Sequence, residues 1–413
     1  MTFASRNVNA AAIPSGFIST TLSPLADFNT VYIGPTGTYW ASGLESGAYY
    51  LYRSTNSGDS WQRTATSIIN APVSAIWQST SGSVVYLGVI DNTTLRGVWV
   101  STDSGSTFEQ ITLPVSGNIY SLQEFNGYVY AGGPNSYRFT LTGAYHDQLD
   151  LRNNGFLINV WAMTRFGGSL ILASNPTTVQ SEGVYSLSPE GVLTPLVGAG
   201  AFIAVATSPS LIAAATISPS FSSQHGVLVG NETSLATSGL YAPGIPFNSL
   251  AYGGIFVGAG QNGYHGADDW GLWYSSNGTT WTRSAVTQFA RSVSFGGGVY
   301  LAGITGGIYK STNGINWTSC ATGCPQALVV PSVTQSAWGD YNPATNTYPV
   351  TLTASPTGGT GTYSYLWSTS SVVYTTELNV IAGQAVTGTV TVTSGSQNQV
   401  INWSVTAPTA PSG

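Results

Sequence analysis

The chain has 413 residues, of which 42% are hydrophobic and 12% aromatic, so it is long enough for two domains with hydrophobic cores. Only 6% of the residues are charged, against roughly 25% in ordinary soluble domains, and the formal net charge is −6. The ten basic residues are scattered singly, which argues against nucleic acid and anionic membrane surfaces as partners.

Glycine and proline indicate the fold class. Fifty Gly and twenty Pro, with no sustained apolar period of 3.6 residues, favour short strands joined by turns over helices. The longest apolar stretch, residues 199–217, is interrupted at Thr207–Ser210 and is too short to cross a bilayer. We therefore expect an all-β protein without membrane insertion. Residues 1–6 lack the features of a secretory signal, so we also expect no conventional export leader.

One hairpin phrase occurs four times, and it predicts a repeat. The copies, which we call the box turns, are Ser54–Trp61, Ser101–Phe108, Ser275–Trp281 and Ser311–Trp317. Their closing aromatic residues lie 47, 173 and 36 residues apart, and 173 is four steps of about 43. A repeat of this length with several strands is typical of a β-propeller, and seven repeats fit within residues 28–325.

Each box turn has residue types suited to a tight hairpin. An Asn or Asp side chain accepts backbone hydrogen bonds, the Gly takes positive φ, and the aromatic residue packs into the core. These residues are Asn56, Gly58 and Trp61; Asp103, Gly105 and Phe108; Asn277, Gly278 and Trp281; and Asn313, Gly314 and Trp317. The last two copies are one residue shorter, which leaves the turn type open. The phrase resembles the Asp-box, or BNR, repeat of sialidases and of many non-enzymatic propellers, and this resemblance implies a β-propeller.

Residues 1–27 lie outside the repeats. Two roles remain open for them: Phe17–Leu22 could close the ring against the last repeat, or residues 1–13 could form an arm that docks on a neighbouring subunit. The two cysteines, Cys320 and Cys324, either close a small disulfide loop or stay free, and with no nearby His they cannot complete a zinc site.

The pattern changes near the C-terminus. Residues 332–406 contain alternating strands between Gly/Pro/Ser-rich turns, which suits a small Ig-like β-sandwich. The stretch Gly358–Trp367 resembles the core-tryptophan strand of polycystic-kidney-disease-type and bacterial or phage Ig-like modules, and this implies a core around Trp367 and Trp403. Residues 407–413 are predicted to be a flexible tail.

We expect no catalytic, cofactor or metal site. The resemblance raises sialidase chemistry, which needs three converging arginines, a Tyr nucleophile with a Glu partner, and an Asp acid. The usual Arg-Ile-Pro motif is absent, and Arg53, Arg63 and Arg283 adjoin box turns, which places them on outer strands. A non-enzymatic protein is therefore predicted.

Two segments that depart from the repeat are candidate binding loops. The first contains Tyr145, His146, Asp147 and Asp150, and could line an axial mouth or an intersubunit contact. The second contains Tyr264, His265, Asp268, Asp269 and Trp270. It either binds a metal or sugar or is a solvated loop supported by tryptophans.

These observations lead to a functional hypothesis. The chain is predicted to be a structural or adhesive virion protein of a tailed bacteriophage, such as a fibre, tail-tip or capsid decoration. It would lie on the virion surface in many copies and contact other virion proteins and a host-surface glycan or protein. The alternative is a bacterial surface or secreted adhesin, and a sialidase-like enzyme is the third reading.

Overall fold

The computed structural model describes most of the chain. The described residues are 13–14, 17–20, 26–58, 60–64, 71–91, 94–175, 182–198, 200–216, 225–235, 240–241, 245–260, 270–320, 326–330, 332–359, 363–394 and 397–411. Their regular structure is β throughout, as predicted. No helix among them has the length and hydrophobicity needed to cross a membrane. The chain divides into two compact units, Met1–Cys324 and Pro325–Gly413.

In the first unit, seven sheets each contain four consecutive strands, counted over the described residues. The first three sheets comprise β3 (Asp27–Ile33), β4 (Tyr39–Glu45), β5 (Ala48–Ser54) and β6 (Trp61–Thr64); β7 (Val73–Gln78), β8 (Val85–Val89), β9 (Gly97–Ser101) and β10 (Thr107–Gln110); and β11 (Ser121–Phe125), β12 (Tyr128–Gly132), β13 (Ser136–Thr140) and β14 (Tyr145–Leu149). A separate hairpin, β15 (Arg152–Asn153) with β16 (Phe156–Leu157), follows the third sheet.

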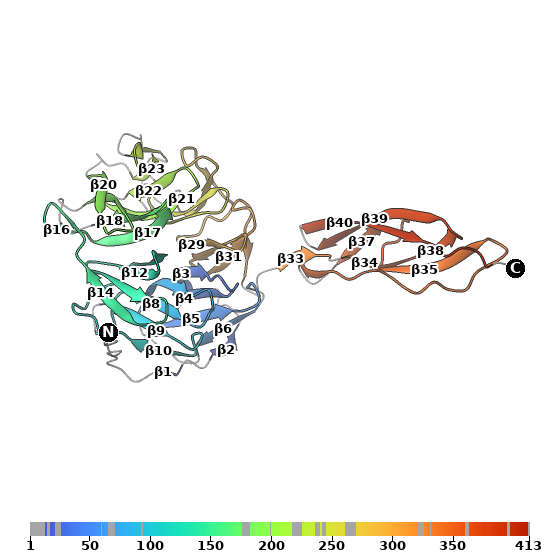
Figure 1. The fold of residues 1–413 in the computed structure, drawn as a ribbon, viewed down its shortest axis with the longest axis horizontal. Coiled ribbons are helices and arrows are strands. Elements are labelled where there is room, and N and C mark those ends of the chain that lie inside the picture. The colour runs from blue at the N-terminus through green and yellow to red at the C-terminus, as the bar shows by residue number, and fades with distance from the viewer. Residues whose placement is uncertain are drawn as a thin grey trace. The chain divides into compact units, whose positions relative to one another are not determined.

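The remaining four sheets continue the same order. They comprise β17 (Val160–Phe166), β18 (Ser169–Ser174), β19 (Gly183–Leu187) and β20 (Leu193–Val197); β21 (Phe202–Thr207), β22 (Ile212–Thr216), β23 (Gly226–Gly230) and β24 (Leu240–Tyr241); β25 (Phe247–Tyr252), β26 (Phe256–Gly260), β27 (Gly271–Ser275) and β28 (Thr282–Arg283); and β29 (Ala290–Gly296), β30 (Val299–Ile304), β31 (Gly307–Ser311) and β32 (Thr318–Ser319). The sheets follow one another around the unit in chain order (Figure 1).

Tight hairpins between the first two strands of a sheet explain why these strands form. Asn126 and Gly127, between β11 and β12, have φ of 48° and 78°, which is the type I′ geometry that matches strand twist. The strands on either side place Phe125 and Val129 in the core, with exposed fractions of 4% and 0%. Local turn chemistry and alternating burial therefore specify the same hairpin.

The N-terminal strands extend the outer edges of two sheets. β2 (Phe17–Thr20) pairs antiparallel with β6 in the first sheet, and β1 (Ile13–Pro14) pairs with β10 in the second. The sequence left closure against the last repeat open as one role for Phe17–Leu22. The structure instead places β2 on the first sheet, where it covers the hydrogen-bonding edge that β6 would expose.

Side chains close the ring between the seventh and first sheets. Phe28 of β3 lies in one core cluster with Leu301 of β30 and Ile308 of β31. Across the same seam, the Val31 amide donates to Ser292 Oγ at 3.2 Å, and Asp27 forms an isolated bridge with Thr305. The seam is therefore held by packing and by individual hydrogen bonds.

The box turns share one hydrogen-bonding arrangement. In the second copy, Ser101 Oγ donates to Asp103 Oδ1 at 2.7 Å and accepts from the Gly105 amide at 2.8 Å. The longer turns have two consecutive positive φ values, such as 61° at Ser104 and 85° at Gly105, whereas the shorter turns have positive φ only at glycine, as at Gly314 with 72°. One extra left-handed residue thus accounts for the difference in length that the sequence left unassigned.

Each box aromatic residue packs against the preceding sheet. Trp61 lies in the cluster that joins the seventh and first sheets, and Phe108 lies with Trp40 and Leu51 of the first sheet. Trp281 packs at a tilt against Phe247, with a ring separation of 4.8 Å, in the cluster shared by the fifth and sixth sheets, and Trp317 lies between the sixth and seventh sheets. The box turn therefore supports contact between sheets as well as its own hairpin.

The second unit has two three-stranded sheets around one core. One contains β34 (Val333–Gln335), β35 (Thr347–Ala354) and β38 (Thr375–Ile381), and the other β37 (Ser364–Trp367), β39 (Ala385–Ser394) and β40 (Gln397–Thr406). β33 (Gln326–Val329) pairs with β36 (Thr357–Gly359). Trp367 and Trp403 lie in the core at a ring separation of 6.5 Å.

The second unit is longer than the range predicted for it. It begins at Pro325, and its core includes Val330 and Ala407, both with an exposed fraction of 4%. The predicted range of 332–406 leaves both residues out. Ala407 and Pro408, within the range predicted as a tail, also form backbone hydrogen bonds to the strand turn at residues 383–384.

Candidate functional site

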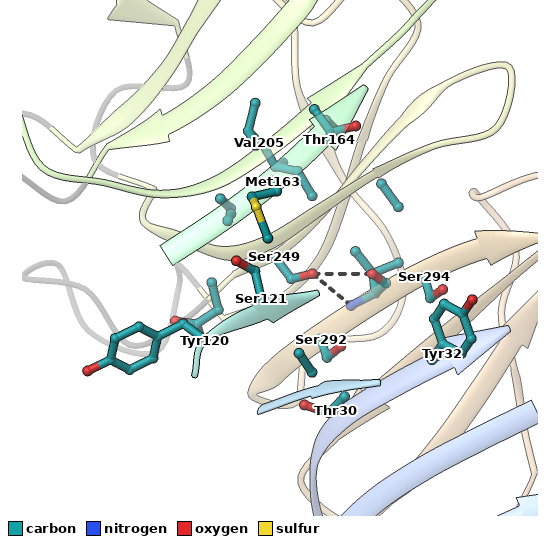
Figure 2. Close-up of a pocket in the computed structure, with 18 of the residues that line it drawn as sticks. Thr30, Tyr32, Tyr120, Ser121, Met163, Thr164, Val205, Ser249, Ser292 and Ser294 are labelled. Carbon is teal, nitrogen blue, oxygen red and sulfur yellow. Dashed lines mark hydrogen bonds between the residues drawn. The ribbon is translucent and has the colours of Figure 1, made fainter. Parts of the chain in front are cut away.

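A central cavity of about 400 Å³ lies where the first strands of the seven sheets meet. These inner strands are β3, β7, β11, β17, β21, β25 and β29, and all of them contribute lining residues (Figure 2). The cavity is therefore built by residues far apart in the sequence that recur at the repeat spacing. This makes it the natural place to look for function in the first unit.

A β-bulge recurs at one end of the inner strands. The pairing register shifts by one residue in six of them, and in the remaining strand the Tyr120 amide bonds to Gly132 O at 2.8 Å beside the same position. Bulges re-aim side chains and are common next to functional sites. The bulge ring, as we call these cavity-lining residues, consists of Asn29, Ser74, Tyr120, Trp161, Ile203, Asn248 and Arg291.

The bulge ring is chemically divided. Tyr120 and Trp161, from neighbouring sheets, stack at 4.3 Å with an angle of 13° between the rings. The Tyr120 ring lies at the rim and points away from the cavity (Figure 2). On the other side, Asn248 and Arg291 contribute polar groups. The Arg291 guanidinium is already bound by Asp27, with Nε at 2.9 Å from Oδ1 and Nη2 at 2.6 Å from Oδ2.

Below the bulge ring, small hydroxyl side chains connect neighbouring inner strands. Ser249 Oγ accepts from the Val293 amide at 3.1 Å and donates to its carbonyl at 3.2 Å, as the dashed lines in Figure 2 show. Ser292 makes the corresponding bond to Val31. The next layer along the strands is apolar: Val31, Ile76, Leu122, Met163, Val205, Leu250 and Val293. Below the bulge ring, the cavity wall is thus uncharged and braced by hydrogen bonds.

A second hollow, the turn-end groove, lies at the opposite end of the inner strands. It has a volume of about 430 Å³ and shares Tyr32, Leu122, Gln123 and Phe295 with the central cavity. Its walls come from the first, second, third and seventh sheets and from the turns at residues 34–37 and 296–297. Among the described lining residues, Glu124 is the only charged side chain.

The Tyr32 hydroxyl in the turn-end groove stays protonated at physiological pH. Burial raises the pKa of Tyr32 to about 12, and the nearby Glu124 carboxylate adds to the rise. The Gln78 amide opposes it by donating to the Tyr32 hydroxyl at 3.4 Å. Tyr32 therefore serves as a hydrogen-bond donor or acceptor and not as an anionic nucleophile.

The predicted binding loop around Tyr145 is a strand. Tyr145, His146 and Asp147 belong to β14, the fourth strand of the third sheet, and none of them lines the central cavity or the turn-end groove. Asp147 forms a two-pronged ion pair with Arg138, and the His146 ring stacks on Tyr128 at 4.5 Å. The alternating polar pattern reflects a sheet edge with one exposed face.

The structure describes only some of the other residues that were predicted to form binding loops. Asp150 pairs with Arg152 at 2.6 Å on the surface, beside the β15–β16 hairpin. In the second predicted loop, Trp270 packs near Phe289 at a ring separation of 6.1 Å. Tyr264, His265, Asp268 and Asp269 lie outside the described residues. Over the part of the chain that the structure describes, no three His, Cys, Asp or Glu side chains form a group suited to a metal ion.

The remaining sequence-derived sites are structural. The arginines beside the box turns lie on β5, β6 and β28, and none lines the cavity; Arg53, for example, donates to Ser104 O at 3.1 Å. Cys320 is buried and disulfide-bonded, while Cys324 lies outside the described residues.

Solved structures establish the fold type. A catalytically inactive virginiamycin B lyase from Staphylococcus aureus with quinupristin aligns with a TM-score of 0.51 at 13% identity, covering 71% of this chain and 97% of that chain. YCF48 bound to D1 peptide aligns with a TM-score of 0.51 at 15% identity, covering 73% of this chain and 98% of that chain. The first unit has a β-propeller fold. The WD40 β-propeller domain of Doa1 aligns with a TM-score of 0.41 at 10% identity, covering 73% of this chain and 97% of that chain.

The comparisons determine the fold but not the activity. The first two of these structures, both with a TM-score of 0.51, are an enzyme variant and a peptide-bound protein, so this propeller fold accommodates different functions. No protein-family model matches the sequence, and no curated protein matches it significantly. Function must therefore be argued from the cavity and the turn-end groove.

The sequence contained a signal for the bulge ring that the repeat analysis did not use. Each ring residue follows directly after a buried apolar residue at or near the start of an inner strand, as Asn29 follows Phe28 and Asn248 follows Phe247. The ring residues differ in chemical type, however, and a search for shared motifs passes over positions that share only spacing.

Proposed function

We propose that the chain is a non-enzymatic attachment protein displayed in many copies on the virion surface of a tailed bacteriophage. On this proposal the seven sheets are the blades of a seven-bladed propeller, the box turns are Asp-boxes, and the second unit is an Ig-like module. The observation that carries the proposal is the lining of the cavity and the turn-end groove, which consists mainly of hydroxyl, amide, aromatic and aliphatic groups. Such a lining suits recognition by hydrogen bonding and stacking.

The charge distribution supports binding without steering by charge. Arg291, which lines the cavity, is engaged by Asp27, and only 6% of all residues are charged. Single-site affinity is then set by short-range contacts, and strength comes from many copies acting together. Host-surface glycan or protein and other virion proteins are the partners that this proposal implies.

A binding assay with intact bacterial cells tests the proposal. The purified chain should bind weakly as a monomer, and the same chain immobilised in many copies on beads should bind roughly 10²–10⁴-fold more strongly. Binding should change little between about 50 and 300 mM salt, because screening acts on charge pairs. Loss of binding with salt, or hydrolysis of a glycan by the monomer, would contradict the proposal and favour an enzyme.

The location is tested separately. A gold label attached after Gly413 should decorate intact phage particles at their surface when the particles carry the labelled chain. Labelling of producing bacteria without any particles would favour the alternative of a bacterial surface or secreted adhesin.

A further inference from the structure

We propose that the turn-end groove binds a neutral sugar ring. The inference rests on the proposed attachment function and names the ligand class and the site. The groove volume of about 430 Å³ lies within the range of about 300–1,000 Å³ typical of small-molecule sites. Tyr32, Gln123, Glu124 and Phe295 line it and are partly exposed, so a ligand can reach them.

The groove has the two kinds of surface that a sugar ring requires. A pyranose has C–H faces that pack on aromatic rings and hydroxyl groups that both donate and accept hydrogen bonds. Phe295 and Tyr32 supply aromatic surface. The Gln123 amide both donates and accepts, and the Glu124 carboxylate accepts. These groups come from the seventh, first and third sheets and meet at one hollow.

The wall of the groove is fixed before any ligand arrives. Gln78 Oε1 accepts from Thr36 Oγ1 at 3.2 Å, and its Nε2 donates to Gly82 O at 3.2 Å, so one side chain ties two turns together. A Cβ at Gly34 would lie 2.0 Å from Gln78 Oε1, so a larger residue there would displace the Gln78 amide from these hydrogen bonds. A preformed wall reduces the entropy lost on binding.

The same residues are a poorer site for a cationic ligand. An aromatic cage for an ammonium group needs several open ring faces. The Tyr39 ring already faces the Lys310 ammonium at 5.8 Å, and Trp77 is 5% exposed and packs on Tyr86 at 5.8 Å. Glu124 then functions as an acceptor for sugar hydroxyls.

A blocking substitution has a matched control in this chain. Gly297 lines the groove, has a φ of 55° and has nothing within 4 Å of an added Cβ. Gly167 occupies the equivalent hairpin position in the fourth sheet, with the same φ of 55° and the same open surroundings, but it does not line the groove. Asn tolerates this backbone region, so both Gly→Asn variants should fold.

The experiment titrates the full chain with the methyl glycosides of glucose, galactose, mannose and N-acetylglucosamine. Saturation-transfer NMR should detect at least one glycoside, with affinity in the millimolar range. Gln123→Ala should weaken it about five- to tenfold, as expected for one lost hydrogen bond. Glu124→Gln should weaken it by a similar factor, because a hydrogen bond to an ionised acceptor is roughly twice as strong as one to a neutral acceptor. Gly297→Asn should weaken it at least as much. Gly167→Asn, Gln148→Ala and Glu190→Gln, all outside the groove, should leave it unchanged.

The outcomes separate this inference from the proposed function. Failure of all four glycosides to bind, binding of tetramethylammonium instead, or equal effects of Gly297→Asn and Gly167→Asn would each overturn the sugar site. If the chain nevertheless attaches to cells, and Gly297→Asn attaches equally well, the proposed function stands without this groove. If the displayed chain attaches to no cell, the proposed function fails whatever the glycosides show.

Discussion

A single hydroxyl group organises each of the four box turns. Ser54, Ser101, Ser275 and Ser311 each accept from the amide of the box glycine at 2.8 or 2.9 Å and donate to the Asn or Asp two residues later. The sequence analysis gave the turn-forming role to the Asn or Asp and the glycine. The serine is equally important, because without it a buried amide would lose its acceptor.

Asp103 gives one box turn a pH dependence that the other three lack. Burial alone would raise its pKa, but hydrogen bonds from Ser101 and Thr107 to the carboxylate outweigh burial and lower the pKa below its usual value. A carboxyl with a depressed folded pKa stabilises the protein above its unfolded pKa of about 3.9, and this contribution is lost as pH falls through the folded value. The other box turns have Asn at this position.

Asp103→Asn should therefore alter how stability varies with pH. The stability of the wild type relative to the variant should be constant above about pH 5 and should fall as the solution is acidified below it. Urea unfolding at a series of pH values measures this difference. A relative stability that rises on acidification, or is flat down to about pH 2, would contradict the assignment.

At the scale of strands, the hairpins could be predicted from residue type, whereas the bulge positions share only their spacing in the sequence. The hairpins at Asn126–Gly127 and Gly297–Gly298 follow from residues with known φ preferences. The bulges arise from how neighbouring inner strands pack around the cavity, and no residue type marks them. β14 was predicted as a loop because it contains several titratable side chains. In the structure its residues alternate between partly buried and exposed, as a strand with one solvent-facing side does.

Trp61 tests the packing between sheets. It is 2% exposed in the cluster that joins the seventh and first sheets, and its indole nitrogen has no hydrogen-bond partner among the described atoms. Trp61→Ala should therefore lose packing alone and cost about 3–5 kcal/mol. Trp281→Ala should cost less, because Trp281 is only partly buried. Calorimetry of the full chain measures both, with the transition of the second unit as internal reference. Equal losses would refute the distinction.

At the scale of the molecule, the all-β class and the propeller fold were predicted from the sequence and are supported by structures of low identity. These predictions succeeded because the same hairpin pattern, which is weak evidence when it occurs once, recurs along the chain. The cavity forms where seven strands from distant parts of the sequence meet. The repeat spacing implies that they meet, but the residue types do not specify it. The second compact unit begins at Pro325 and includes β33, which precedes the change in sequence pattern near residue 332.

The second unit should fold alone. A fragment of residues 326–411 contains both sheets and the core around Trp367 and Trp403, and it should melt in one cooperative transition. A fragment that starts at Ser332 lacks β33 and the buried Val330, and should melt at a lower temperature. Circular dichroism on heating compares them. Identical melting curves would show that β33 contributes nothing.

The seam between the seventh and first sheets has a consequence for how such a chain can be rearranged. Every sheet of the ring takes its four core strands from one continuous stretch, and the seam is joined by contacts such as Arg291 with Asp27. No sheet therefore needs both chain ends. A circular permutant of the first unit that links residue 320 to residue 26 through a short linker, and opens between any other two sheets, would omit β1 and β2 but would keep the four core strands of every sheet. The propeller fold therefore does not depend on which of its sheets comes first in the sequence.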